Sequence, residues 1–227
     1  MERNLADIFE VVVDAVPDRE ALVVGCGERR LTYGELDERA NRLAHHLAGA
    51  GIGPGDHVAA YLYNGCEFIE TMLAAFKLRA AVVNVNYRYV AKELEYVLRD
   101  SDAKAVVYDT RFTSTLAGVD ADLPKLGARL AVGEGERVPG STAYEKSLAA
   151  ASPVRPEIPR TGDDLYLLYT GGTTGMPKGV MWRHSDLVTA GIGNLDGART
   201  AEEQAERARA GRDRQLPACP LMHGAAQ

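Results

Sequence analysis

Residues 170–178 gather three glycines, three threonines and one lysine within nine positions. Glycines have no Cβ, so the backbone there can approach a ligand closely and adopt positive φ. Successive N–H groups that point inward form an anion-binding nest. The threonine hydroxyls add donors, and Lys178 adds a positive charge. This combination predicts a loop that holds a polyphosphate.

The spacing differs from that of the Walker A loop, in which glycine, lysine and a hydroxyl residue follow one another at the start of a helix. Here Met176 and Pro177 separate the last glycine from Lys178, and Gly179 takes the place of the hydroxyl residue. Apolar runs precede and follow the loop, which favours a strand–loop–strand hairpin. The other interpretation is a flexible turn without a ligand, but a turn rarely needs so many glycines and threonines.

The elements around this loop alternate between strand-like and helix-like segments, which indicates an α/β fold with a mostly parallel sheet and flanking helices. Asn4 is expected to cap a first helix, and Thr32 with Glu35 forms a capping box for a second. Further helices are expected at 67–78 and 92–98, and strands at 21–24, 30–32, 57–63, 81–85 and 104–108.

Prolines at every third position predict an extended, exposed connector over 152–160. It would separate a first α/β subdomain, 1–151, from the beginning of a second one, 161–227, which carries the phosphate loop. Within the second unit, Asp164 is expected in a solvated turn and Ser185 as a helix cap.

A capping box at Thr200 and Glu203 begins a charged stretch that ends at Arg214. This stretch lacks an apolar face, so we expect a solvated helix or a mobile insertion.

The charge and cysteine content exclude several classes of function. The chain has 26 basic and 32 acidic residues, for a net charge of −6, so a nucleic-acid partner is not expected. Cys26, Cys66 and Cys219 are scattered, which indicates a reducing cytoplasm and neither a disulfide framework nor a zinc site. No apolar run approaches the ~20 residues of a membrane-spanning helix.

Residues 170–180, Thr-Gly-Gly-Thr-Thr-Gly-Met-Pro-Lys-Gly-Val, resemble the phosphate loop of the adenylate-forming superfamily, which includes acyl-CoA synthetases, luciferases and the adenylation domains of peptide synthetases. Gly171 stands where serine is usual. Other similar blocks lie at 31–36, 40–44, 76–86 and 220–224, so the resemblance extends over the chain. In one of them, Arg79 stands where a glycine is usual. The continuation Val-Met-Trp-Arg-His is most similar to actinobacterial long-chain and sterol-side-chain acyl-CoA ligases.

The resemblance implies a two-step reaction. A carboxylate attacks the α-phosphorus of MgATP, pyrophosphate leaves, and the coenzyme A thiol captures the acyl-adenylate. The residues that the resemblance places around the nucleotide phosphates are Thr170, Gly171, Gly172, Thr173, Thr174, Gly175, Pro177 and Lys178.

Three of the implied roles are more specific. Thr170 would contribute its hydroxyl to Mg²⁺, and Lys178 would neutralise phosphate or pin the closed loop. His223 lies between Met222 and Gly224 on an expected turn, and the resemblance places it beside the nucleotide and the acyl channel. The alternative for His223 is a buried polar residue that holds a loop.

Members of the superfamily are roughly twice as long, in keeping with the roughly 200–300 residues that one hydrophobic core can serve. The blocks that bind magnesium through glutamate, hold the ribose and supply the catalytic lysine would follow residue 227. We therefore expect the N-terminal part of an ATP-dependent acyl-CoA ligase, inactive alone, whose partners are a carboxylic acid, ATP, CoA and its own C-terminal part.

Two alternatives stay open. The chain could be a non-catalytic phosphate-binding or interaction module. It could also belong to an aryl-CoA ligase or an amino-acid adenylation domain. Self-association is open as well, because an incomplete domain would expose surface that its missing part covers.

Overall fold

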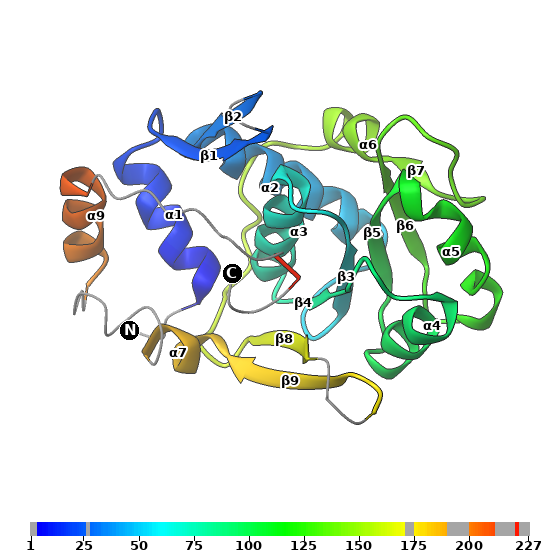
Figure 1. Ribbon diagram of the computed structural model, residues 1–227. Helices are drawn as coiled ribbons and strands as arrows, with labels where there is room; N and C mark the ends of the chain where they lie inside the picture. Colours follow the sequence, from blue (N-terminus) through cyan, green and yellow to red (C-terminus); the bar gives the residue numbers. More distant parts are fainter. Residues whose placement is uncertain (1–3, 26–27, 171–174, 190–199, 212–220, 223–227) are drawn as a thin grey trace.

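A computed structural model of the chain describes residues 4–25, 28–170, 175–189, 200–211 and 221–222 (Figure 1). The larger sheet consists of β3 (His57–Tyr61), β4 (Ala81–Asn84), β5 (Ala105–Asp109), β6 (Ala128–Val132), β7 (Thr142–Ala143), β8 (Leu165–Thr170) and β9 (Lys178–Arg183). Within the described ranges its order is β7-β6-β5-β3-β4-β8-β9, and all neighbours are parallel except β8 and β9. A separate antiparallel hairpin joins β1 (Glu20–Val24) to β2 (Arg29–Thr32).

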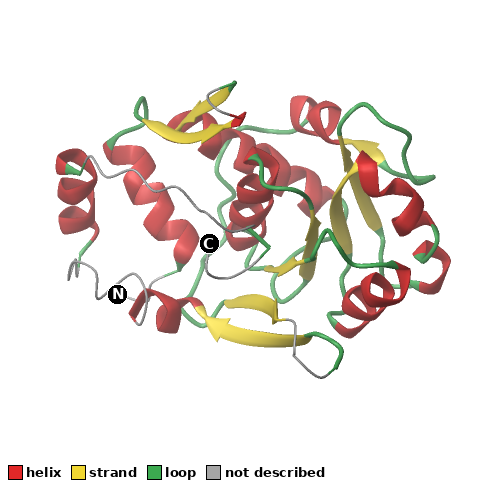
Figure 2. Cartoon of the chain, viewed as in Figure 1, coloured by secondary structure: helices red, strands yellow, loops and turns green. Residues whose placement is uncertain are grey.

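Helices cover both faces of the larger sheet (Figure 2). The described helices are α1 (Leu5–Ala15), α2 (Tyr33–Gly49), α3 (Cys66–Lys77), α4 (Ala91–Asp100), α5 (Thr113–Ala117), α6 (Tyr144–Ala150), α7 (His184–Leu187) and α9 (Ala201–Ala210), with short 3₁₀ turns at Thr110–Phe112 and Asp120–Asp122. The expected α/β class with a mostly parallel sheet is confirmed.

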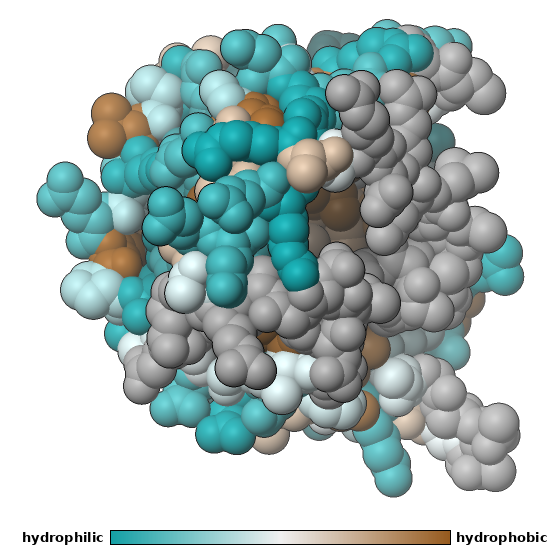
Figure 3. Space-filling view, turned by 90° about the vertical axis from the view of Figure 1, so that its left-hand side faces the viewer, coloured by the Kyte–Doolittle hydropathy of each residue, from teal (hydrophilic) through white to brown (hydrophobic). Residues whose placement is uncertain are grey.

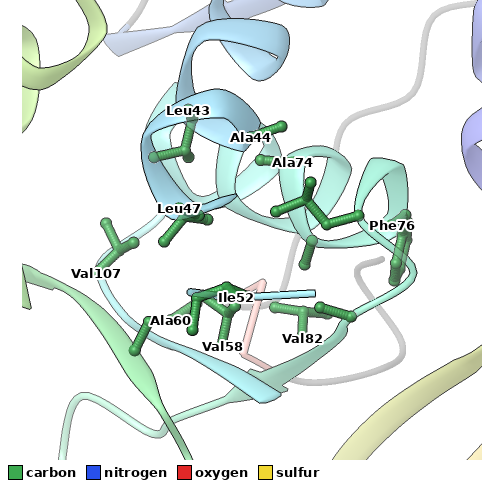
Figure 4. Packing of buried hydrophobic residues seen from close by; sticks show 14 of the residues in the cluster. Leu43, Ala44, Leu47, Ile52, Val58, Ala60, Ala74, Phe76, Val82 and Val107 are labelled. Atoms are coloured by element: carbon green, nitrogen blue, oxygen red, sulfur yellow. The ribbon is translucent and has the colours of Figure 1, made fainter. Parts of the chain in front are cut away.

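Alternating residues of each central strand form two separate cores, because successive side chains of a strand point to opposite faces. In β3, Val58 and Ala60 pack with α2 and α3, where Leu43, Leu47 and Phe76 complete the cluster (Figure 4). The intervening residues of β3 pack against α4 and α5 on the other face. The sheet is therefore buried on both sides, as expected for parallel strands.

Local capping signals are confirmed at three of the four expected positions. Asn4 accepts a hydrogen bond from the Ala6 N–H at 2.7 Å and caps α1. Thr32 with Glu35 forms the capping box of α2, and Thr200 with Glu203 forms that of α9. The expected cap at Ser185 is wrong: α7 begins one residue earlier, and its N-cap position is held by an arginine without a side-chain hydrogen bond.

Helix α9 has no buried residue, as expected of a solvated helix. Figure 3 shows mostly hydrophilic residues over the described part of the side on which α9 and α1 lie. Arg19 holds the end of this helix by donating to main-chain carbonyls, including those of Arg209 at 3.0 Å and Gly211 at 2.8 Å. These donors satisfy carbonyls that have no partner within a helix.

Residues 152–160 have no regular secondary structure, and beyond them β8 joins the sheet of the first 151 residues, with Leu167 opposite Val83 of β4. The sequence predicted an exposed connector, and the structure differs from this prediction. Arg155 and Arg160 are partly buried against acidic side chains of α1 and α2. The division into two subdomains at this connector stays a prediction.

A buried charge cluster ties the connector to the helical layer. Lys77 has a fully buried side chain, and its ammonium donates to Asp37 at 2.7 Å and to Glu10. Arg155 binds Asp37 at 2.9 Å, and Arg160 binds Glu10 at 3.0 Å. Burial alone would raise the pKa of both carboxyl groups, but these cations hold both pKa values below the ordinary range.

Arg79 adopts a backbone conformation that favours glycine, the residue usual at this position in the superfamily that the sequence resembles. It follows the C-cap residue of α3 and has φ +60°. The Arg79 N–H donates to the Phe76 carbonyl at 3.1 Å, and the Ala80 N–H donates to the Ala75 carbonyl at 2.9 Å. This is the Schellman arrangement, in which glycine is preferred because the left-handed conformation strains other residues. Arg79 also donates from Nε to Asp164 at 2.9 Å.

We expect Arg79→Gly to be more stable than Arg79→Ala by about 1 kcal/mol. Both changes remove the ion pair with Asp164, but only glycine relieves the backbone strain. Urea unfolding of the two variants measures the difference. An alanine variant that equals or exceeds the glycine variant would contradict the strain at this position.

Candidate functional site

The predicted strand–loop–strand hairpin is confirmed. Strands β8 and β9 pair antiparallel, and their register closes with Thr170 opposite Lys178. Directly opposite residues of an antiparallel pair have side chains on the same face, with Cβ atoms about 5 Å apart. Both side chains are exposed. The hairpin therefore places the side chains of Thr170 and Lys178 on the same face, where the two strands meet residues 171–177.

The other predicted site residues fall into two groups, within and outside the described part of the chain. Gly175 is exposed and Pro177 is buried where the chain enters β9. Gly171, Gly172, Thr173, Thr174 and His223 lie outside the described residues.

Lys178 differs from the basic residue at the far end of the same strand. Arg183 pairs with Asp186 at 2.8 Å and with Asp163 at 3.2 Å. Among the ion pairs of the described residues, none engages Lys178. Its ammonium group is therefore available to an anionic ligand.

Tyr169 and Gly179 form the next cross-strand pair. A Cβ added to Gly179 would lie 3.0 Å from the Tyr169 ring, so the glycine leaves space for this ring. The Tyr169 hydroxyl donates to Asp100 at 2.7 Å. Burial and the neighbouring Asp100 raise the pKa of Tyr169. Because its hydroxyl stays protonated and bonded to Asp100, Tyr169 fixes the strand that enters the loop.

Two asparagines that the sequence analysis missed hold the same region. Asn84 is the last residue of β4, and it accepts a hydrogen bond from the Tyr169 N–H at 2.7 Å and donates to the carbonyls of Tyr169 and Met222. Asn64, shortly after β3, accepts from the Leu221 N–H at 2.8 Å. Polar residues at the carboxyl ends of two buried parallel strands were a usable signal, because ligands bind at this edge of open α/β sheets.

The expectation of a solvated turn at Asp164 is wrong. Asp164 is buried and accepts from Asn4 Nδ2 at 2.8 Å, from the Thr161 N–H at 3.0 Å and from Arg79 Nε at 2.9 Å. One carboxylate thus joins the cap of α1, the end of α3 and the entrance to β8. Trp182 lies on the edge strand β9 and is 41% exposed.

His184 lies where β9 ends and α7 begins, with its side chain fully buried. Its Nδ1 accepts from the Leu5 N–H at 3.2 Å, and its ring meets the edge of Phe76 at a centroid distance of 4.5 Å. Burial lowers the pKa of His184 to about 4. The neutral ring is therefore a structural link between α7 and the start of α1.

We expect His184 to make the fold less stable in mild acid. Because its pKa is lower in the folded chain than the ordinary ~6.5, the unfolded chain binds more protons between these values. Its contribution is complete above about pH 6.5 and is lost as the pH falls towards 4, by about 1–3 kcal/mol. His184→Asn keeps an acceptor for Leu5 without a titrating group. Urea unfolding from pH 7 to 4 should give a flatter profile for the variant; parallel profiles would contradict the assignment.

Among the described residues, no group of three or more His, Cys, Asp and Glu side chains could hold a metal ion. In the same part of the chain, no helix combines the length and the apolar character that a membrane crossing requires.

Comparison with known proteins gives consistent results. The AMP-binding enzyme family matches residues 9–227. A 3-oxocholest-4-en-26-oate–CoA ligase of Rhodococcus rhodochrous is 42% identical over 237 residues, which cover 100% of this chain and 42% of that protein. A medium/long-chain-fatty-acid–CoA/3-oxocholest-4-en-26-oate–CoA ligase of Mycolicibacterium smegmatis is 42% identical over 238 residues, covering 100% of this chain and 43% of that protein. The chain thus spans less than half the length of these curated relatives.

Solved structures agree with these relatives. A fatty acyl CoA synthetase of Mycobacterium tuberculosis has a TM-score of 0.75 at 26% identity, over 87% of this chain and 38% of that chain. The N-terminal domain of FACL13 from the same organism has a TM-score of 0.76 at 26% identity, over 92% of this chain and 55% of that chain.

Proposed function

Because the chain belongs to the AMP-binding enzyme family, we propose that residues 170–178 bind the phosphates of MgATP in an ATP-dependent acid–CoA ligase. In the first step, a carboxylate attacks the α-phosphorus and pyrophosphate leaves. In the second step, the CoA thiol attacks the acyl-adenylate and AMP leaves. The names of the relatives favour a long-chain fatty acid or a sterol-derived acid as the substrate.

The observation that carries this proposal is the hairpin that ends with Thr170 opposite Lys178. Negative charge grows on the leaving pyrophosphate during the first step. Donors that are already in place therefore stabilise the transition state more than the ground state. Lys178 has an exposed ammonium group that no described carboxylate engages, which suits this role.

We assign the remaining roles by the same argument. The backbone of residues 171–175 and the hydroxyls of Thr173 and Thr174 cradle the β- and γ-phosphates. His223 contacts the nucleotide or the acid. The location of the reaction is the cytoplasm, a proposal supported by the scattered cysteines, of which Cys66 is free and buried.

The residues present also fit a magnesium ion that is bound mainly by the nucleotide. Mg²⁺ prefers oxygen ligands and is commonly held by substrate phosphates with few protein ligands. The exposed hydroxyl of Thr170, at the base of the loop, is a ligand of this kind. When bound, the ion would neutralise charge on the phosphates, and Thr170 would orient it.

A second candidate function is a phosphate-binding module without turnover. The hairpin that pairs Thr170 with the exposed Lys178 would serve phosphate binding alone as well as turnover.

Pyrophosphate release tests both candidates. We would supply MgATP, CoA and a graded panel of fatty and sterol-derived acids to three proteins: this chain, the Rhodococcus ligase, and a chimera in which residues 1–227 replace the matching stretch of that ligase. We expect release by the chimera and the parent ligase. Release by this chain too would make it a self-sufficient adenylating enzyme. An active parent with a folded but silent chimera would overturn the ligase proposal and favour the binding module.

A further inference from the structure

One side chain connects the phosphate-binding hairpin to the segment that carries His223. Asn84 is 3% exposed and lies at the carboxyl end of β4. Its Oδ1 accepts from the Tyr169 N–H at 2.7 Å, and its Nδ2 donates to the Tyr169 carbonyl at 3.2 Å and to the Met222 carbonyl. Tyr169 directly precedes Thr170, and Met222 directly precedes His223.

The amide group is suited to this position because it offers two donor protons and an acceptor. In parallel strands β4 and β8, the described register pairs Val83 with Leu167, one residue before Asn84. One residue further along β4, the side-chain amide of Asn84 forms hydrogen bonds with both the N–H and the carbonyl of Tyr169 in β8. Its second donor proton extends the same contact to Met222, a third segment of the chain.

We propose that Asn84 is a positioning residue that couples the phosphate-binding hairpin to the His223 segment. This inference rests on the proposed function, in which residues 170–178 hold the phosphates and His223 contacts the acid or the nucleotide. The first step requires the carboxylate and the α-phosphorus to meet in a narrow range of geometries. A single buried amide that bonds both Tyr169 and Met222 would keep these two residues, each next to a proposed site residue, in a fixed relative position.

Asn64, which follows the neighbouring strand β3, provides a matched control. It accepts a hydrogen bond from the Leu221 N–H at 2.8 Å, so it contacts the residue next to Met222, which Asn84 contacts. Its described hydrogen bond involves Leu221 and does not extend to Tyr169. A change at Asn64 should therefore disturb the His223 segment without acting on the phosphate hairpin.

Amide hydrogen exchange in this chain tests the connection without any catalytic activity. We expect Asn84→Ala to increase exchange about tenfold or more at both Tyr169 and Leu221, whereas Asn64→Ala increases it at Leu221 alone. Asn84→Asp is the second variant, should the alanine variant not fold. It keeps the acceptor for Tyr169 but loses both donor protons, so Leu221 should respond. Unchanged exchange at Leu221 in the folded Asn84 variants would overturn the proposal.

A double-mutant cycle in the chimera tests the coupling in the reaction. In the chimera with Asn84 intact, the effects of Lys178→Ala and His223→Ala on kcat/KM should be non-additive by about tenfold. In the chimera that carries Asn84→Ala, the two effects should be additive. Two results would overturn the coupling. One is non-additivity that survives Asn84→Ala but is lost with Asn64→Ala, and the other is additivity in the chimera with both asparagines intact. If exchange behaves as expected but the chimera releases no pyrophosphate, the proposed function fails and the structural connection stands.

Discussion

Replacing Lys178 with alanine should lower kcat/KM for MgATP in the chimera by about 10- to 150-fold, because a charge-assisted hydrogen bond contributes about 1.5–3 kcal/mol. Lys178 pairs with Thr170 where β8 and β9 meet, and its ammonium group has no carboxylate partner in the described part of the chain. Its charge is therefore available to the phosphates that we propose bind there. Because the side chain is exposed, the melting temperature should stay within about 2 °C of the parent value.

Lys125→Ala is the matched control, since this lysine is also exposed, at 62% of its side chain, and its partner is a surface aspartate, Asp102. It should leave turnover within about twofold of the parent value. Equal turnover in the Lys178 and Lys125 variants would remove Lys178 from the phosphate site. A fall in melting temperature that matches the loss of activity would make it a structural residue instead.

Short-range signals made much of the fold predictable from the sequence. The caps at Asn4, Thr32 and Thr200 join residues no more than three positions apart, so the local sequence contains the whole interaction. The same holds for the hairpin β8–β9, whose two strands flank one loop. Strands β3 to β5 were recognisable as apolar runs, with ends that differ from the observed ones by one or two residues.

The stretch from residue 110 to 151 shows where such signals end. It contains β6, the two-residue strand β7, and the short helices α5 and α6, none of which the sequence analysis predicted. Helices of five and seven residues contain too few turns to show a clear apolar period. These elements owe their stability to tertiary packing, as short helices usually do.

The candidate site was predictable only in its local part. Residues 170–178 stand out in the sequence because the proposed binding residues are contiguous. The contacts that position them are not: Asn84 lies 85 positions before Tyr169 and 138 before Met222. Asp164 is held by Asn4 across 160 positions, which explains why its sequence neighbourhood indicated a solvated turn. Pairings of this kind follow from the sheet order and not from any local pattern.

Replacing Lys77 with methionine should lower the free energy of unfolding by about 3 kcal/mol, at the low end of the range for removing one partner of a buried ion pair. Methionine has a similar length, so the change removes the charge without creating a large cavity. Asp37 and Glu10 then keep only the connector arginines, Arg155 and Arg160, as cationic partners. Urea unfolding with an unchanged m-value measures the loss, because m reports the surface that unfolding exposes.

The decisive control for Lys77 neutralises its partners. If the loss comes from carboxylates left without their buried cation, then Lys77→Met combined with Glu10→Gln and Asp37→Asn should be more stable than Lys77→Met alone, since desolvated charge is removed with the ammonium group. If the loss comes from packing, the triple variant should be no more stable than the single one. Stability of the single variant within about 0.5 kcal/mol of the parent would show that Arg155 and Arg160 alone balance the two carboxylates. The expected outcome makes Lys77 the cation that fixes α1 and α2 to the end of α3, beside Arg79 and the strand that leads to the phosphate loop.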